Sequence, residues 1–99
     1  MILTRFVDGR VFAGISEMAK RFVYILKNSE IPPRYYTGIA SDVAKRHADH
    51  NAGCSIHTAK YRPWCIDVVV EFADERRALA FERYLKTGSG GAFARRHLR

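Results

Sequence analysis

With 99 residues, the chain is the size of a single domain with one core, and its apolar fraction of 47% is ordinary for a globular protein. This composition argues against disorder. Lys and Arg outnumber Asp and Glu by 17 to 10, a net charge of +7 that points to a polyanionic partner. The alternative is a basic face without such a partner. From Arg83 to the end of the chain there are five basic side chains and no acidic one.

Residues 1–17 precede the first clear strand and carry two basic and two acidic residues. They lack the continuous apolar stretch of a signal peptide. We expect them to be a dispensable extension, with residues 18–99 forming the domain. A β-hairpin around Asp8-Gly9 is the competing interpretation.

The next elements are two strands and a helix. Residues 21–28, RFVYILKN, are β-branched and aromatic, which is typical of a strand. Residues 29–40 turn at Pro32-Pro33 and run back as the second strand of a hairpin. Ser41 is suited to cap a helix over residues 42–51 that ends near Gly53.

The second half of the chain continues with an irregular loop at 53–63 and a third strand at 64–72. Asp74 is expected to cap a second helix with Ala78, Phe81 and Leu85 at helical spacing. The stretch TGSGGAF at 87–93 is expected to end that helix, before a short last one. The order β-β-α-β-α-α predicts an α+β fold, a small mixed sheet covered by helices.

No segment is long enough to span a bilayer, and the two cysteines fit a reducing cytosol, so we predict a cytoplasmic location and no membrane partner. Cys65 is expected to be a small buried residue. As an alternative, a zinc ion would be surrounded by His50, Cys54, His57 and Cys65.

Candidate chemistry lies on the first helix. Asp42, Arg46 and His50 are spaced by four residues and share one stripe that begins just past Gly38. Gly38 permits close backbone approach where the strand ends, and Arg46 is suited to grip a phosphate. The alternative is an Asp42–Arg46 surface pair with a solvated His50, and buried or rim positions for Tyr24 and Tyr36.

Glu82 is placed beside the apolar stripe of the second helix, where a carboxylate needs a cation or donors. A pair with Arg83, Lys86 or another arginine is one solution. A divalent ion is the other, because one carboxylate with waters and a substrate phosphate is typical of Mg²⁺.

Taken together, these residues carry a resemblance. VYI at 23–25, YTG at 36–38, Arg46, HNAG at 50–53 and Glu82 in a later helix resemble the GIY-YIG endonuclease family over residues 20–87. The loop HTAKYRPW is similar to that of small single-domain members related to the nuclease domains of the ABC excinuclease and of structure-specific junction nucleases. The leading glycine of the first tripeptide is absent.

The resemblance implies a three-stranded antiparallel sheet flanked by helices and hydrolysis of phosphodiester bonds in DNA with Mg²⁺ or Mn²⁺, without a small-molecule cofactor. Glu82 corresponds to the metal ligand, and the implied catalytic residues are Tyr24, Tyr36, Arg46, His50 and Glu82. Those expected to bind substrate are Gly38, Asn51, His57, Thr58, Lys60 and Lys86. Lys86 is included because the polar group that many members place after the glutamate helix has no evident match in this sequence.

In the implied mechanism, a phenol near a metal ion and an arginine loses its proton more easily than free tyrosine. Tyr24 would then deprotonate the attacking water, directly or through His50 or Tyr36. The implied substrates include single-stranded, branched or duplex DNA, as in repair or recombination. The alternative function is a non-catalytic nucleic-acid-binding module of the same fold.

Overall fold

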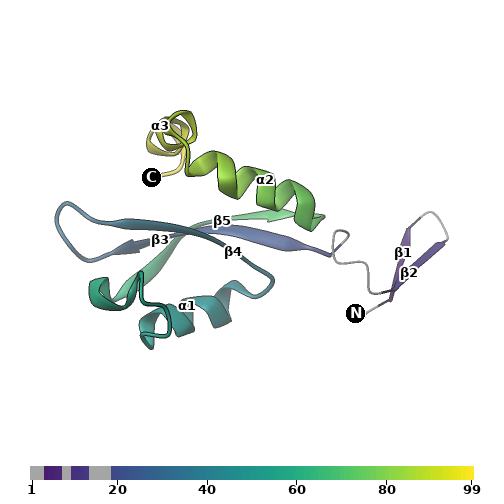
Figure 1. Ribbon diagram of the computed structural model, residues 1–99, viewed down its shortest axis with the longest axis horizontal. Helices are drawn as coiled ribbons and strands as arrows, with labels where there is room; N and C mark the ends of the chain where they lie inside the picture. The colour runs from purple at the N-terminus through teal and green to yellow at the C-terminus, as the bar shows by residue number, and fades with distance from the viewer. Residues whose placement is uncertain (1–3, 8–9, 14–18) are drawn as a thin grey trace.

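A computed structural model describes residues 4–7, 10–13 and 19–99 (Figure 1). From residue 19 onward the order is β-β-α-β-α-α, as the sequence predicts, with a short 3-10 helix in the loop. The elements are β1 (Thr4–Val7), β2 (Arg10–Ala13), β3 (Arg21–Asn28), β4 (Tyr35–Ala40), α1 (Val43–Asn51), η2 (Ala59–Tyr61), β5 (Trp64–Phe72), α2 (Glu75–Leu85) and α3 (Gly88–His97). Among the residues that the structure describes, no helix has the length and apolar character needed to cross a membrane.

The central sheet has three antiparallel strands in the order β4-β3-β5. Along β3, Tyr24 lies opposite Gly38 of β4 and Val69 of β5. A register shift on the β5 side falls between Ile25 and Leu26. The predicted α+β fold is therefore confirmed, including the predicted bounds of β3 and β5. The sheet is antiparallel throughout, as the resemblance implied, and not mixed as the order of elements suggested.

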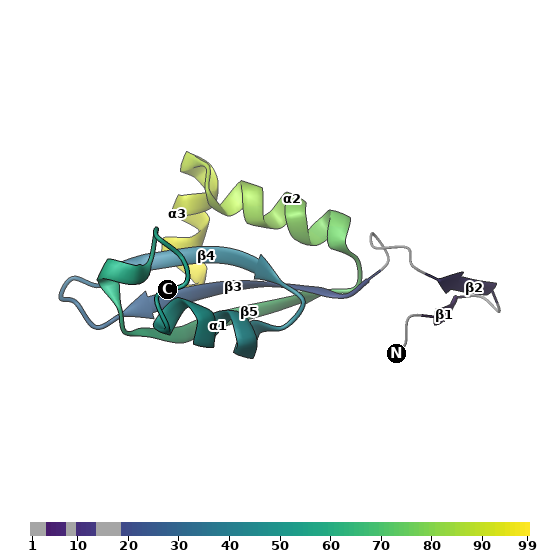
Figure 2. The same ribbon diagram turned by 60° about the horizontal axis from the view of Figure 1, so that its bottom comes forward.

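Helices cover the two faces of the sheet, α1 on one and α2 with α3 on the other (Figures 1 and 2). Successive side chains of β3 alternate between these faces. Val23 packs in a cluster with Ala78, Leu85 and Ala94 beneath α2 and α3. Tyr24 belongs to the cluster on the α1 face with Leu26, Ala40 and Trp64. The strand pattern thus sends Tyr24 toward α1.

The cap of α1 differs from the prediction. Asp42, not Ser41, is the N-cap, since its backbone is extended and its carboxylate accepts a hydrogen bond from the Lys45 backbone N–H at 3.0 Å. This interaction satisfies a donor that the first turn leaves free. The helix ends at Asn51, and Gly53 follows with φ of 83°, in the left-handed region that favours glycine.

The junction between α2 and α3 is also different. Asp74 caps α2 as predicted, but the expected break at 87–93 is mostly helix. The Thr87 side chain accepts from the Gly90 backbone N–H at 3.1 Å and starts α3 there. Gly90 is required because a Cβ at this position would overlap the Tyr84 carbonyl. Glycines that were expected to break a helix thus allow α3 to pack closely against α2.

The expected burial of Cys65 is wrong. Its side chain is exposed, as is that of Cys54. Cys65 lies opposite Lys27, which is also exposed, at an uncovered end of the edge strand β5. Periodicity alone does not show where a helix stops covering a strand.

At the N-terminal end, β1 and β2 pair antiparallel, with Val7 opposite Arg10. This pairing agrees with the hairpin interpretation of the segment. Asp8 and Gly9, on which that interpretation was based, lie outside the described residues. That residues 1–17 are dispensable stays a prediction.

Candidate active site

Tyr24 and Gly38 form the floor of the candidate site. Tyr24 is 1% exposed, and its ring lies across the backbone of Gly38 on the neighbouring strand. A Cβ at Gly38 would stand 2.5 Å from Cζ and 2.9 Å from Cε1 of Tyr24, and closer still to the hydroxyl oxygen. Gly38 therefore makes room for the phenol, a more specific role than the expected contact with substrate.

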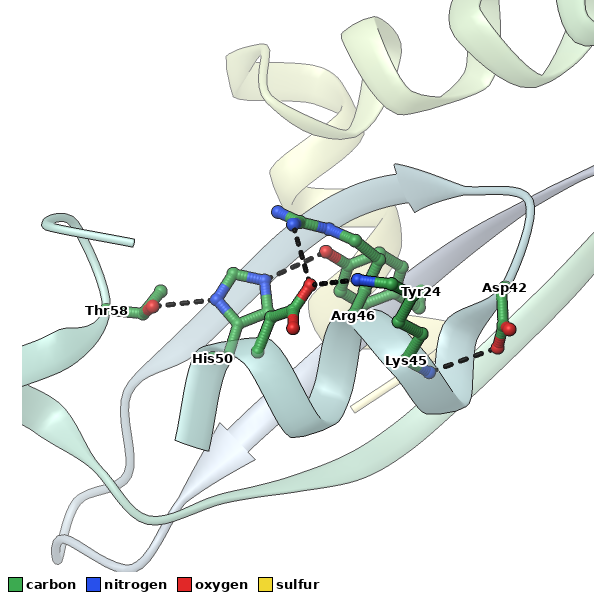
Figure 3. Close-up of polar contacts among 7 residues, drawn as sticks. Tyr24, Asp42, Lys45, Arg46, His50 and Thr58 are labelled. Carbon is green, nitrogen blue, oxygen red and sulfur yellow. Dashed lines mark hydrogen bonds and ion pairs between the residues drawn. The ribbon is translucent and has the colours of Figure 1, made fainter. Parts of the chain in front are cut away.

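A buried chain of hydrogen bonds leads away from the phenol (Figure 3). The Tyr24 hydroxyl is 3.0 Å from His50 Nε2, and His50 Nδ1 is 2.7 Å from Thr58 Oγ1. His50 and Thr58 are both 0% exposed. When Nδ1 carries the proton it donates to Thr58, and Nε2 accepts from Tyr24; the other neutral tautomer reverses both bonds. His50 is thus a buried partner of Tyr24, and the alternative of a solvated helix-end residue is wrong.

Both titratable groups in this series of hydrogen bonds, Tyr24 and His50, have a pKa shifted from the ordinary value. Burial, followed by the charge of Arg46, lowers the pKa of His50, which favours neutral imidazole at pH 7. Burial and the neighbouring Tyr36 raise the pKa of Tyr24, Arg46 lowers it, Glu82 raises it, and the net direction is upward. Among the protein's own groups, the loss of solvation outweighs the Arg46 guanidinium, so easier deprotonation of Tyr24 beside a metal ion and an arginine stays a prediction.

Arg46 lies one turn before His50 on α1, as the spacing predicts, and is close enough to bear on both Tyr24 and His50. The expected alternative partner, Asp42, is committed to the helix cap. Arg46 Nη1 instead lies 3.5 Å from Asp49 Oδ2, and Lys45 Nζ lies 3.2 Å from the same oxygen. Asp49 was not identified from the sequence, although its i,i+3 spacing from Arg46 could have revealed it.

Tyr36 is a third ring in the candidate site, beside those of Tyr24 and His50. It comes from β4, and its ring centroid is 4.8 Å from that of His50 and 6.3 Å from that of Tyr24. Unlike Tyr24, it is only partly buried. The site therefore has one fully enclosed phenol and one on its rim.

Glu82 comes from α2, on the other face of the sheet, yet its carboxylate acts on the pKa of Tyr24. Its side chain is 13% exposed and forms an ion pair with Lys86, whose side chain is 52% exposed. The cation expected beside this carboxylate is thus the ammonium of Lys86 one turn later. Lys86, expected to bind substrate, is engaged with Glu82.

The remaining residues expected to contact substrate divide into two groups. Asn51 binds the backbone of Trp64 with both ends of its amide, at 2.9 Å and 2.7 Å, which ties α1 to the start of β5. Thr58 is buried behind His50. These two therefore hold the site in place. His57 and Lys60 lie in the segment between α1 and β5. Both are exposed, so a ligand can reach them.

The zinc alternative has no geometric support in the described ranges. No group of three or more His, Cys, Asp or Glu side chains in residues 19–99 could hold a metal ion. His50 is taken up by Tyr24 and Thr58, and both cysteines are exposed.

The fold and this set of side chains define a small α+β domain in which a buried phenol, an imidazole and a guanidinium lie together, with a mostly buried carboxylate on the other face of the sheet. A family model for the GIY-YIG catalytic domain matches residues 20–91. The chain therefore belongs to the GIY-YIG family, a family of nuclease type. Comparison with curated proteins and with solved structures gave no significant match.

Proposed function

We propose that this protein is a divalent-metal-dependent endonuclease that hydrolyses phosphodiester bonds in DNA. The observation that carries the proposal is the convergence on Tyr24 of groups from different elements. Arg46 from α1 and Glu82 from α2 both act on its pKa, although the helices lie on opposite faces of the sheet. A buried phenol whose pKa is shifted by burial and by named charged partners is typical of a functional site.

The residues present fit a magnesium or manganese ion. Glu82 offers hard carboxylate oxygens, is mostly buried and has a single flexible cation as partner. Because residues 19–99 contain no cluster of three acidic, His or Cys side chains, the other ligands would be waters and a substrate phosphate, the arrangement that Mg²⁺ favours. When bound, such an ion supplies positive charge for the leaving oxygen and orients the phosphate.

In this proposal, Tyr24 acts as the base through His50. Burial raises the pKa of Tyr24 and lowers that of His50, so the transfer of the Tyr24 proton to Nε2 of the neutral imidazole would need the positive charge of Arg46 and of a bound divalent ion. The resulting phenolate takes a proton from the attacking water. The water oxygen bonds to phosphorus while the bond to the leaving oxygen breaks. Thr58 accepts a hydrogen bond from Nδ1–H and so supports the imidazolium that forms.

Arg46 and Tyr36 have distinct roles here. The Arg46 side chain is 43% exposed, so it can release Asp49 and turn toward the non-bridging oxygens, where charge grows. Its charge also favours the phenolate of Tyr24. Tyr36 lies against His50 and limits the entry of water from the rim.

For the substrate, we propose single-stranded or branched DNA, of the kind processed in repair and recombination. A small catalytic domain offers a limited contact area, which disfavours tight sequence specificity. The basic surplus supplies affinity for the backbone of any such DNA.

The test is Glu82→Gln. Glutamine keeps the shape of glutamate and removes the charge, so the variant should fold and bind DNA with the same salt dependence. Nicking in the presence of Mg²⁺ or Mn²⁺ should nearly vanish, since loss of several kcal/mol of transition-state stabilisation is about a thousandfold in rate.

The matched control is Glu75→Gln at the start of the same helix, where the carboxylate lies 3.6 Å from Arg21. It removes the same charge from α2 outside the site, and nicking should persist. Undiminished nicking by Glu82→Gln would refute the mechanism. A wild-type protein that binds DNA but cleaves none of the single-stranded, duplex, flap and junction forms would favour a non-catalytic binding module.

A further inference from the structure

A pocket lies between α2 and α3, outside the candidate active site. Its volume is about 230 Å³. One lining residue, Tyr84, comes from α2, and the others come from α3: Ser89, Ala92, Phe93, Arg96 and His97. This is smaller than the roughly 300–1,000 Å³ of drug-sized sites, so it suits a single flat ring.

The helical repeat explains how α3 forms this pocket. Its five lining residues follow the spacing i, i+3, i+4, i+7 and i+8, which is one face of a helix. Ser89 and Ala92 are small and leave the space open. Phe93 borders it, with its ring centroid 6.0 Å from Tyr84 and 5.0 Å from His97. The pocket is therefore a slot with aromatic walls.

Tyr84 is available to a ligand. It is 39% exposed, although it also contacts Phe81 and Phe93 of the aromatic cluster beneath. Phe93 is partly buried and supports the slot from the core side. Tyr84 therefore offers part of its ring to a ligand at the mouth of the pocket.

The lining of the slot includes positive charge and no negative charge. Arg96 lines it, Arg95 is its neighbour in sequence, and none of its lining side chains is acidic. From Arg83 to the end of the chain no acidic residue occurs at all. An occupant with a flat ring and a negative charge is thus favoured.

We infer that this slot binds one unpaired nucleotide of a DNA substrate, with its base against Tyr84 and Phe93 and its phosphate on Arg96. Aromatic side chains with an adjacent arginine are the usual means of holding single-stranded nucleic acid. The inference deepens the proposed function, since it takes DNA as the partner and selects substrates with an unpaired segment.

The slot is separate from the catalytic groups. Tyr84 follows Glu82 by two positions, about 200° around the helix axis, so the two side chains leave α2 on opposite sides. The slot therefore positions the DNA strand and makes no contact with the reacting atoms. Its loss should weaken binding of substrates with an unpaired arm and leave the active-site groups intact.

The test uses a flap DNA with 2-aminopurine in its unpaired arm, whose fluorescence is quenched when the base stacks. Wild type and Glu82→Gln should both quench it in the absence of a divalent ion. Tyr84→Leu keeps an apolar side chain but removes the ring, and should lose the quenching. Its affinity for the flap should fall about tenfold to hundredfold, the effect of removing one stacking aromatic, with little change for duplex.

The matched control compares Arg96→Gln with Arg95→Gln, which remove the same charge from neighbouring positions of α3. Only Arg96→Gln should reduce the quenching, while both should weaken duplex binding slightly. Equal quenching by Tyr84→Leu and wild type, or equal effects of the two arginine variants on the flap, would overturn the inference. If wild type quenches but nicks no DNA, the proposed function fails and the nucleotide slot stands.

Discussion

Gly38→Ala tests the geometry of the candidate site with the smallest change the sequence allows. The added Cβ would lie 2.5 Å from Cζ of Tyr24, whereas ordinary contact begins at 3.4 Å, so the ring must move by about 0.9 Å. Tyr24 has little freedom to move, because its hydroxyl is bonded to His50 and the imidazole is held by Thr58 on its far side.

The size of the effect follows from this confinement. Overpacking a tight core costs about 1–3 kcal/mol. Breaking the Tyr24–His50 bond to relieve the clash costs a similar amount, about 1–3 kcal/mol, because buried polar atoms are left unpaired. For a domain of this size each kcal/mol shifts Tm by about 4–8 °C, so we expect a fall of about 5–20 °C by calorimetry. Metal-dependent nicking should fall by about tenfold or more, since the phenol is displaced.

Gly88→Ala is the matched control. Gly88 stands at the start of α3, and a Cβ there would meet nothing within 4 Å. This variant should be neutral or slightly stabilising, because alanine favours helix over glycine. If Gly38→Ala were as stable and as active as Gly88→Ala, the close approach of Tyr24 to β4 would not exist and the proposed geometry of the site would be wrong.

Other consequences of the structure can be measured separately. Lys86→Met removes the ammonium that competes with a metal ion for Glu82. It should tighten Mn²⁺ binding up to about fivefold by calorimetric titration, because partly exposed ion pairs contribute about 0.2–1 kcal/mol. Unchanged Mn²⁺ binding would mean that Lys86 does not compete with the metal ion. Thr58→Val should lower the free energy of unfolding by about 1–3 kcal/mol and Thr58→Ser by clearly less, because only serine keeps the hydroxyl beside His50 Nδ1; equal losses in urea titrations would mean that the methyl group matters more. Since the pKa of His50 is lowered, the unfolded chain binds a proton more readily, and stability should decline as pH falls from about 6.5 toward the lowered pKa. His50→Gln should lack that part of the decline. Deletion of residues 1–17 should leave Tm and nicking nearly unchanged, and a large drop in Tm would show that this segment stabilises the domain.

Local chemistry made the secondary structure readable from the sequence. The β-branched run of β3, the Asp74 cap and the repeat of Ala78 and Leu85 each depend on residues within about one or two turns. The ordered motif residues indicated the GIY-YIG family, and the match of the family model to residues 20–91 confirmed it. The sequence-based prediction was wrong where contact with a neighbouring element determines the local structure. Gly90, for example, was expected to end a helix, but it allows α3 to contact α2.

The sequence by itself determined which chemical groups the candidate site can offer, because Tyr24, Arg46, His50 and Glu82 carry their chemistry wherever they stand. Only the tertiary structure decided their state. Burial between α1 and the sheet raises the pKa of Tyr24 and lowers that of His50, and no local pattern encodes that loss of solvent. The partner of His50 is likewise a matter of folding, because Thr58 reaches it from a loop whose path depends on how Asn51 ties α1 to β5.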